Sequence, residues 1–309
     1  MDISIVLCTL NNAARLRQTL LHIANCRIPR GITWEVVVVN HNSRDGTEAV
    51  AREMASLLPL NYVIELCPGL SRARNCGLAA ASGAMIVFTD DDVKPDPGWI
   101  ETYWRAYTAF PAGQFWGGPI ESEFEGGEPD WNLASLGPPS VKGLDYGREP
   151  RKLSQNMSFI APNWAAPRAA VMAAGGFDLT LGLNAAAGNP TVGEETDLMR
   201  KLLLAGLEAW YLPAAKLRHI VPKAKVSLAH FAKRRRSDGL YGARDLPMHK
   251  VVPFLGVPRW VVRRILTDYA SWLLAKATAK NGFAEYLSLC EALGLAQGFR
   301  SRSSRRANP

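Results

Sequence analysis

The sequence predicts an α/β protein in which a mainly parallel sheet is flanked by helices and followed by a helical, basic C-terminal extension. Three observations carry this prediction. Short apolar runs alternate with helical patterns through the first third of the 309 residues, as in βαβ units. One of these runs ends in three consecutive carboxylates, at residues 90–92. After Val221 the pattern becomes mostly helical and rich in Lys and Arg.

The alternating pattern sets the expected order of elements. Each expected strand is an apolar run bounded by turn residues, and each expected helix is an amphipathic segment. We expect strands over residues 3–8, 34–39, 62–66, 85–89 and 209–212. We expect helices over residues 13–25, 47–57, 70–81, 168–174 and 197–205. Gly and Pro interrupt much of the middle third, which predicts long loops over the sheet where substrates bind.

The net charge of +8 is divided unevenly along the chain. Residues 214–309 contain 19 Lys or Arg against 5 Asp or Glu, whereas the first 213 residues contain 17 against 23. This asymmetry indicates an acidic catalytic body joined to a basic region that meets phosphates, anionic lipid or nucleic acid. A solvated basic helical surface is the alternative. We therefore expect a catalytic domain over residues 1–221 and a helical basic extension over residues 222–309.

The cysteines, the N-terminal residues and the length of the apolar stretches indicate where the protein is located. The five cysteines form no CxxC pair, which argues against a zinc site and for a reducing compartment. The N-terminus lacks the basic region and long apolar core of a signal peptide. No stretch reaches the roughly 20 uncharged apolar residues of a membrane helix. We expect a cytoplasmic protein, associated through its basic helices with the inner face of the plasma membrane.

The carboxylates Asp90, Asp91 and Asp92 stand at the carboxyl end of an expected strand. Carboxylates this close favour protonation unless a cation or a hydrogen-bond donor lies among them. A hard divalent ion such as Mg²⁺ or Mn²⁺ prefers such oxygen ligands. An Asp-rich turn or helix cap accounts for one or two Asp residues but not for three. Ligands of open α/β sheets bind beyond the carboxyl ends of the strands, which places Thr9 and Asn11 in the same candidate region.

Several motifs follow one another in a consistent order between Ile3 and about Gly242. They read VNHNSRDGT at 39–47, GLSRARN at 69–75, FTDDD at 88–92, GGFD at 175–178 and GEETDL at 193–198. Asn163 and His219 complete the set. This order resembles the family 2 glycosyltransferases of the GT-A type, which have a Rossmann-like fold and are inverting enzymes that use nucleotide sugars.

The resemblance assigns roles on the donor side. It implies that Asp90 lies near the ribose and that Asp92 ligates the Mg²⁺ or Mn²⁺ ion. Such an ion neutralises charge on the diphosphate as the glycosyl bond breaks. Asp91, between Asp90 and Asp92, is also expected to contact the donor. His219 stands where the family often has a further metal-side histidine, which favours Mn²⁺. The alternative is an ordinary surface or core histidine.

Two more donor contacts are expected at the ends of neighbouring strands. Asn40 stands where the family commonly has an Asp that holds the nucleoside, and an amide offers both a donor and an acceptor to a base edge. Arg72 and Arg74 begin a helix whose N-terminus can meet a diphosphate. Residues two apart on a helix point in different directions, so one of the two is expected at the site. The resemblance favours Arg72.

The acidic motif at 193–198 resembles the element that supplies the general base. Glu195 stands where Asp is more usual in the family, and a base has to reach the acceptor hydroxyl within hydrogen-bond distance. The alternative is a helix N-terminus enriched in acids for dipole reasons. The resemblance places Glu194, Asn163 and Trp164 on the acceptor side, where Trp164 would stack on a sugar face. Trp164 can equally be a core residue.

The predicted reaction is transfer of a sugar from a nucleoside diphosphate to a hydroxyl of a glycan or lipid-linked acceptor, with inversion and metal assistance. Residues 1–115 would bind the nucleotide sugar and residues 116–221 the acceptor, in cell-surface polysaccharide or glycolipid biosynthesis. A metal-dependent sugar nucleotidyltransferase is one alternative, but it needs a Gly-rich basic loop where TLNNA stands at 9–13. A non-catalytic carbohydrate-binding relative is another alternative.

The basic C-terminal segment mixes apolar and cationic residues, as in WVVRRIL at 260–266. This composition fits peripheral contact with an anionic leaflet. Packing within an oligomer is the alternative, and the sequence does not predict an oligomeric state. Nucleic acid is not an expected partner, because no recognition motif accompanies the basic run.

Overall fold

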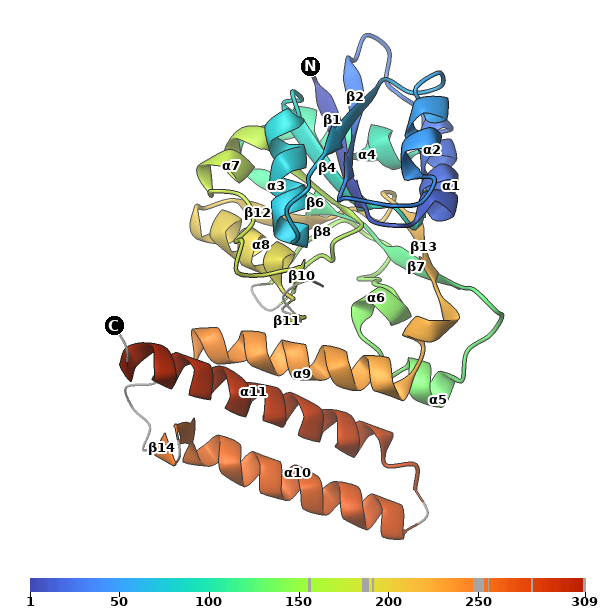
Figure 1. Ribbon diagram of the computed structural model, residues 1–309. Coiled ribbons are helices and arrows are strands. Elements are labelled where there is room, and N and C mark those ends of the chain that lie inside the picture. Colours follow the sequence, from blue (N-terminus) through green and yellow to red (C-terminus); the bar gives the residue numbers. More distant parts are fainter. Residues whose placement is uncertain are drawn as a thin grey trace.

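A computed structural model describes residues 1–154, 157–184, 189–190, 192–246, 253–254, 256–278 and 280–307. A large sheet with helices on both faces stands above a layer of long C-terminal helices (Figure 1). Across these ranges, no helix combines the length and the apolar character that a membrane crossing requires.

The large sheet has eight strands in the order β3-β2-β1-β4-β9-β6-β12-β8. Their bounds are β1 (Ile3–Thr9), β2 (Trp34–Asn40), β3 (Leu60–Ile64), β4 (Met85–Asp90), β6 (Gln114–Gly117), β8 (Arg151–Lys152), β9 (Trp164–Pro167) and β12 (Glu208–Tyr211). Strands β3, β2, β1 and β4 are parallel, which confirms the expected βαβ organisation. Strand β9 runs antiparallel to both β4 and β6, so the second half of the sheet is mixed.

Helices cover both faces of this sheet. One face carries α1 (Ala13–Ala24), α2 (Thr47–Met54) and α4 (Trp99–Ala109), and the other carries α3 (Leu70–Ala80), α7 (Arg168–Ala173) and α8 (Glu194–Leu204). Alternate residues of β1 serve the two cores, with Ile5 on the first face and Val6 on the second. Burial on both faces explains why the parallel strands read as continuous apolar runs.

The predicted elements of the first third agree with the structure to within about two residues at most ends. One difference matters for function. Helix α8 begins at Glu194, three residues earlier than residue 197, and Glu195 therefore lies in its first turn. The prediction of long loops in the middle third is wrong in part. The short strands β6, β7 (Ile120–Phe124), β8 and β9 form there, as do the single-turn helices α5 (Trp131–Ala134) and α6 (Pro139–Lys142).

A second sheet of three strands lies beside the carboxyl end of β4. It contains β5 (Val93–Pro95), β13 (Leu217–Val221) and β7 (Ile120–Phe124) in the order β5-β13-β7. Strand β5 begins directly after the Asp triplet, and β13 places His219 opposite Val93. The second sheet therefore joins two sequence motifs that are far apart in the chain.

The C-terminal part is helical, as expected. Helices α9 (Leu228–Asp245) and α11 (Phe283–Ala307) lie side by side, and α10 (Arg259–Ala277) is the outermost of the three (Figure 1). Helix α9 lies nearest to the sheets. The backbones of α9 and α11 approach closely at Gly294, where an added Cβ atom would lie 2.0 Å from the carbonyl oxygen of Arg236. The remaining short elements are η1 (Lys223–Lys225), β10 (Leu183–Asn184), β11 (Asn189–Pro190), β14 (Pro253–Phe254) and β15 (Val257–Pro258).

Candidate active site

The Asp triplet lies where the two sheets meet. Asp90 is the last residue of β4, and its Cα pairs with Cys8 at the end of β1. The backbone carbonyl of Asp92 accepts a hydrogen bond of 2.8 Å from Ile220 N, next to His219 on β13. This backbone contact holds the carboxylate of Asp92 against the second sheet.

The side chain of Asp92 is enclosed by cationic and imidazole groups. His219 Nε2 lies 3.3 Å from Asp92 Oδ1, and Lys225 Nζ lies 3.4 Å from Oδ2. The Asp92 and His219 side chains are 10% and 5% exposed. Burial alone would raise the pKa of Asp92, but the hydrogen bond and charge of His219 and the charge of Lys225 lower it. Asp92 is therefore the member of the triplet that stays ionised most readily.

Asp92 and His219 are also the residues that fit a divalent metal ion. The part of the chain that the structure describes contains no group of three or more His, Cys, Asp or Glu side chains placed to hold a metal. Mg²⁺ is commonly held by one or two carboxylates together with substrate phosphates. The buried Nδ1 atom of His219 has no hydrogen-bond partner among the described residues. The donor set fits an ion whose remaining ligands come from a bound diphosphate.

The other two carboxylates of the triplet have different surroundings. Asn12 Nδ2 donates a 2.8 Å hydrogen bond to Asp91 Oδ1. Burial, and then the charge of Asp92, raise the pKa of Asp91 to about 7. Burial also raises the pKa of Asp90, and the nearby Arg74 opposes this rise. The three carboxylates are therefore not equivalent, and the structure assigns them different proton affinities.

Arg74 connects the triplet to the acidic motif of α8. Its guanidinium lies 2.5 Å from Glu194 Oε1, 3.6 Å from Asp90 Oδ1 and 3.9 Å from Glu195 Oε2, and the side chain is 7% exposed. The sequence prediction favoured Arg72, but Arg72 is exposed on another side of α3, and Arg74 is the arginine that the structure brings to these carboxylates. Successive helical residues are rotated by about 100°, so residues 72 and 74 face different ways.

Glu194 and Glu195 open helix α8 immediately after Gly193, whose φ of 100° is in the left-handed region. Burial, followed by the negative charge of Glu194, raises the pKa of Glu195 to about 8. For Glu194, burial acts in the same direction, but the charge of Arg74 and the hydrogen bonds to the carboxylate together outweigh it and lower the pKa. Among the described residues, neither buried Oε2 atom has a hydrogen-bond partner. Two adjacent carboxylates with opposite pKa shifts are suited to separate roles, and Glu195 is poised near neutral pH for proton transfer.

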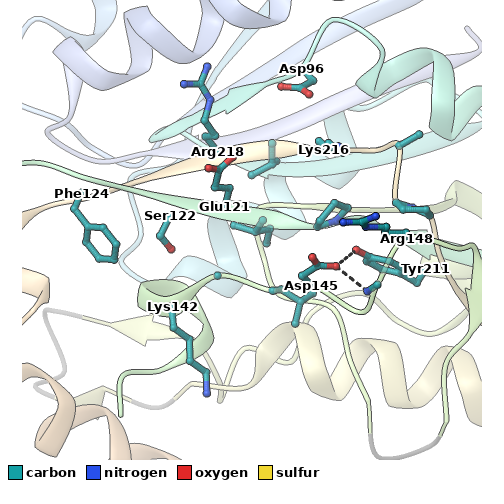
Figure 2. A pocket seen from close by; sticks show the side chains of 18 of the residues that line it. Asp96, Glu121, Ser122, Phe124, Lys142, Asp145, Arg148, Tyr211, Lys216 and Arg218 are labelled. Carbon is teal, nitrogen blue, oxygen red and sulfur yellow. Dashed lines mark hydrogen bonds between the residues drawn. The ribbon is translucent and has the colours of Figure 1, made fainter. Parts of the chain in front are cut away.

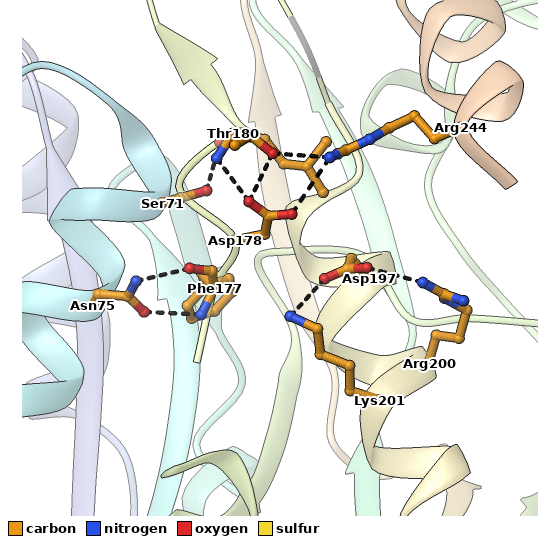
Figure 3. A network of polar contacts seen from close by, with 10 residues as sticks. Ser71, Asn75, Phe177, Asp178, Thr180, Asp197, Arg200, Lys201 and Arg244 are labelled. Carbon is orange, nitrogen blue, oxygen red and sulfur yellow. Dashed lines mark hydrogen bonds and ion pairs between the residues drawn. The ribbon is translucent and has the colours of Figure 1, made fainter. Parts of the chain in front are cut away.

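A polar network outside this cluster fixes the segment between α7 and β10 (Figure 3). Asn75 Nδ2 donates to the carbonyl of Phe177, and Phe177 N donates back to Asn75 Oδ1, at 2.8 and 2.9 Å. Ser71 Oγ donates to the Leu181 carbonyl at 2.7 Å. Arg244 of α9 binds Thr180 Oγ1 at 2.9 Å. The network ties this segment to α3, the helix that carries Arg74, and to α9.

Three further predicted donor-binding residues lie at the ends of β1 and β2. Thr9 is buried at the end of β1. Asn11 has a φ of 51°, and its side-chain carbonyl accepts a hydrogen bond from Arg44 N. Asn40 donates to Tyr62 Oη at 2.6 Å and accepts from Ser43 N at 2.8 Å. Asn11 therefore links the β2–α2 loop to the segment that follows β1, and Asn40 links the start of that loop to β3.

The structure contradicts two of the predicted acceptor contacts. Asn163 is fully buried, and its Oδ1 atom accepts hydrogen bonds of 2.7 Å from both Trp99 Nε1 and Tyr103 Oη. Its amide nitrogen donates to the carbonyls of Pro119 and Ala215. Trp164 is 1% exposed and stacks on Phe88 with ring centroids 4.5 Å apart. Both side chains are committed to the core. The prediction that Asn163 contacts an acceptor is wrong, and for Trp164 the structure agrees with the alternative of a core residue.

A large pocket that the sequence did not predict lies along β7 and β13 (Figure 2). Its volume is about 1100 Å³, and Ser122 on its wall pairs with His219 in the register of the two strands. Trp131 is 55% exposed at the pocket and makes an edge contact with Phe124. Lys142, Asp145 and Arg148 supply charged groups. The sequence signal that could have indicated this wall is a Trp that follows the Gly- and Pro-containing run at 126–129.

Comparisons with known proteins identify the family of this chain. Residues 4–174 match the family model described as Glycosyl transferase family 2. The chain is 25% identical over 296 residues to the succinoglycan biosynthesis protein ExoM of Rhizobium meliloti (strain 1021), covering 92% of this chain and 82% of that protein.

Two solved structures share the fold at low sequence identity. One is the mannosyltransferase PcManGT from Pyrobaculum calidifontis in complex with GDP-Man and Mn²⁺, with a TM-score of 0.58, 21% identity and coverage of 99% of this chain and 84% of that chain. The other is S. aureus TarS 1-349 in complex with UDP-GlcNAc, with a TM-score of 0.57, 14% identity and coverage of 99% and 92%. The fold is that of the GT-A glycosyltransferases. The chain belongs to glycosyl transferase family 2.

Proposed function

We propose that this glycosyltransferase moves a sugar from a nucleoside-diphosphate-sugar donor to a hydroxyl of a glycan or lipid-linked acceptor, with inversion at the anomeric carbon. One observation carries the proposal. The buried Arg74 brings Asp90 of the triplet and the Glu194–Glu195 pair of α8 into one cluster at the carboxyl end of the central strand β4. Donor-side and base-side groups thus meet where ligands of open α/β sheets bind.

In the proposed reaction, Glu195 takes the proton of the acceptor hydroxyl. The acceptor oxygen forms a bond to the anomeric carbon while the bond from that carbon to the diphosphate oxygen breaks. The nucleoside diphosphate leaves with the electron pair. Attack from the face opposite the leaving group inverts the configuration. The raised pKa of Glu195 makes its carboxylate a stronger base than an ordinary glutamate, and Arg74 holds Glu194 ionised beside it.

On the donor side, Asp92 and His219 would hold a divalent ion, Mg²⁺ or Mn²⁺. When bound, this ion would neutralise negative charge on the departing diphosphate. Lys225 lies on the other oxygen of Asp92 and adds a positive charge at the same place. Asp90 and Asp91 would line the donor beside them, and the Mn²⁺ in the PcManGT complex supports the choice of metal class.

The acceptor would occupy the pocket along β7 and β13. Its exposed Trp131 offers a flat face to the C–H surface of a sugar, while its charged side chains can bind hydroxyl groups. The pairing of Ser122 with His219 places one wall within a strand spacing of the proposed metal ligand. The relative named for succinoglycan biosynthesis supports a role in cell-surface polysaccharide or glycolipid synthesis.

We further propose that residues 1–221 form the catalytic domain, with a donor half over 1–115 and an acceptor half over 116–221, and that residues 222–309 form a separate extension. The reaction would take place on the cytoplasmic side. Peripheral contact of the extension with the membrane would bring the enzyme to a lipid-linked acceptor.

The first test is a donor screen. Purified protein is heated with each of a panel of nucleotide sugars, with and without Mn²⁺, and the unfolding temperature is recorded. A donor at about 100 times its dissociation constant should stabilise the fold by roughly 2.7 kcal/mol. Asp92→Ala should abolish the Mn²⁺-dependent part of this shift. A donor whose shift is the same with and without the metal, in both proteins, would contradict the metal site.

A further inference from the structure

We propose that the outer face of helix α10 binds an anionic lipid surface. Helix α10 packs against α11 on one side and against the short β14–β15 hairpin near its start. Its other side points away from the rest of the molecule, below α11 (Figure 1). The inference rests on the membrane contact proposed above for the C-terminal extension and assigns that contact to one surface, which lies on the far side of the C-terminal helices from the active site.

The outer face of α10 is defined by residues three or four positions apart, which form one stripe on a helix. Its members are Arg259, Arg263, Leu266, Ala270, Leu273, Leu274 and Ala277, all of which are exposed. Leu266, Leu273 and Leu274 are 64%, 46% and 65% exposed. Large apolar side chains gathered on one exposed face indicate an interaction site rather than chance exposure.

The charges of α10 decide which partner this face suits. The exposed charged residues of the helix are Arg259, Arg263 and Lys276, all cationic. The one acidic residue in its sequence, Asp268, is partly buried toward α11, where it accepts a hydrogen bond of 2.8 Å from Ser288 and pairs with Arg264 at 3.5 Å. The outer side of α10 is thus apolar and positive, with its single negative charge turned inward.

An anionic lipid surface complements both the apolar and the positive character of this face. Leucine side chains enter the boundary between headgroups and acyl chains, and Arg or Lys side chains bind the phosphates. Tyr269 is 47% exposed on the flank of the face, at the level where aromatic residues contact an interface. A second copy of this chain would instead bring the same cations against each other across a two-fold axis.

Vesicle sedimentation of the full chain tests the inference. Vesicles of phosphatidylcholine with about 30 mol% phosphatidylglycerol are compared with pure phosphatidylcholine, at low salt and at about 0.5 M NaCl. The wild type should sediment with the anionic vesicles about tenfold more strongly than with the neutral ones, and less strongly at high salt. The double variant Leu273→Glu with Leu274→Glu should weaken this binding about tenfold or more.

Two further variants show whether the loss of vesicle binding is specific to the outer face of α10. Leu204→Glu adds a charge at a leucine of α8 that is 77% exposed, and it should bind vesicles like the wild type. Arg259→Gln with Arg263→Gln removes cations without adding a charge, and it should weaken binding at low salt and reduce the salt dependence. The unfolding temperature of each variant is measured to check that the fold is retained.

Equal vesicle binding by the wild type and the Leu273→Glu, Leu274→Glu variant would overturn the inference. So would a wild type that binds neither vesicle and instead forms a dimer that the same variant dissociates. Release of nucleoside diphosphate with a soluble acceptor is measured in parallel. A wild type that releases nucleoside diphosphate but does not bind anionic vesicles would contradict the membrane surface alone. A wild type that binds the vesicles without turnover would contradict the proposed reaction alone.

Discussion

The active-site cluster and the outer face of α10 differ in the exposure of their charged side chains. At the cluster, the Arg74 and Glu194 side chains are 7% and 5% exposed and form an ion pair with each other. On α10, Arg259 and Arg263 are exposed. Removing a partner from a buried pair leaves an uncompensated charge in a medium of low dielectric constant, whereas an exposed charge is solvated with or without a partner. We therefore expect substitutions in the cluster to affect catalysis and folding strongly, and those on α10 to affect binding alone.

The largest effect is expected for Glu195→Gln. An amide cannot accept the acceptor proton, so kcat should fall by about 10² to 10⁴. Because the carboxylate form of Glu195 appears as the pH passes its pKa of about 8, the wild-type rate should rise between roughly pH 6.5 and 9. The variant should lack this rise. Initial rates of nucleoside diphosphate release measure both effects.

Glu48→Gln is the matched control for Glu195→Gln. Glu48 also lies in the first turn of a helix, but its side chain is 53% exposed and pairs with Arg52 on the surface of α2. Its substitution should leave the rate and the pH profile unchanged. A Glu195→Gln rate within about threefold of the wild type would exclude Glu195 as the base.

Arg74→Met should give the next largest effect, this time on stability. The substitution leaves Glu194 and Asp90 without their buried partner, which should lower the free energy of unfolding by about 3–5 kcal/mol. Arg72→Met, two residues away and exposed, should change it by less than about 0.5 kcal/mol. Urea unfolding at neutral pH compares the two variants. Equal destabilisation by both would contradict the role given to the buried cluster.

Trp131→Ala should weaken the binding of the acceptor moderately and leave the binding of the donor unchanged. Loss of a stacking contact of about 0.5–1.5 kcal/mol should raise the acceptor KM by roughly 2- to 12-fold. The donor KM should not change, since Trp131 lines the pocket along β7. Trp131→Phe keeps a flat ring and should stay close to the wild type. A rise in the donor KM without a rise in the acceptor KM would place the acceptor elsewhere.

The smallest effect is expected for the stability of Arg259→Gln with Arg263→Gln. These exposed side chains should contribute less than about 0.5 kcal/mol to the free energy of unfolding, in contrast to Arg74. Urea unfolding without vesicles measures this value. A loss of stability near that of Arg74→Met would remove the distinction between the two regions.

Much of the fold and part of the site could be predicted from local sequence patterns. The parallel strands are apolar runs of the right length, and their helices show the expected periodicity, so β1, β2, β4, α1 and α3 appear close to their predicted bounds. The carboxylates Asp90 to Asp92 were singled out because they follow an apolar strand, whereas Glu194 and Glu195 were singled out through their resemblance to the acidic motif of the family.

The remaining site features depend on contacts between distant segments. The choice between Arg72 and Arg74 is made by carboxylates on β4 and α8, which a local pattern does not reveal. Asn163 is polar yet buried, because Trp99, Tyr103 and two backbone carbonyls satisfy its hydrogen bonds. The wall of the pocket along β7 comes from loops whose order in space is set by the second sheet.

We propose above all that the cluster around Arg74, at the carboxyl end of β4, is a centre of inverting glycosyl transfer. The most direct test is nuclear magnetic resonance analysis of the products formed from a donor identified in the screen. The account predicts one nucleoside diphosphate per sugar transferred and a product whose anomeric configuration is opposite to that of the donor. Release of pyrophosphate, or a product with retained configuration, would contradict it.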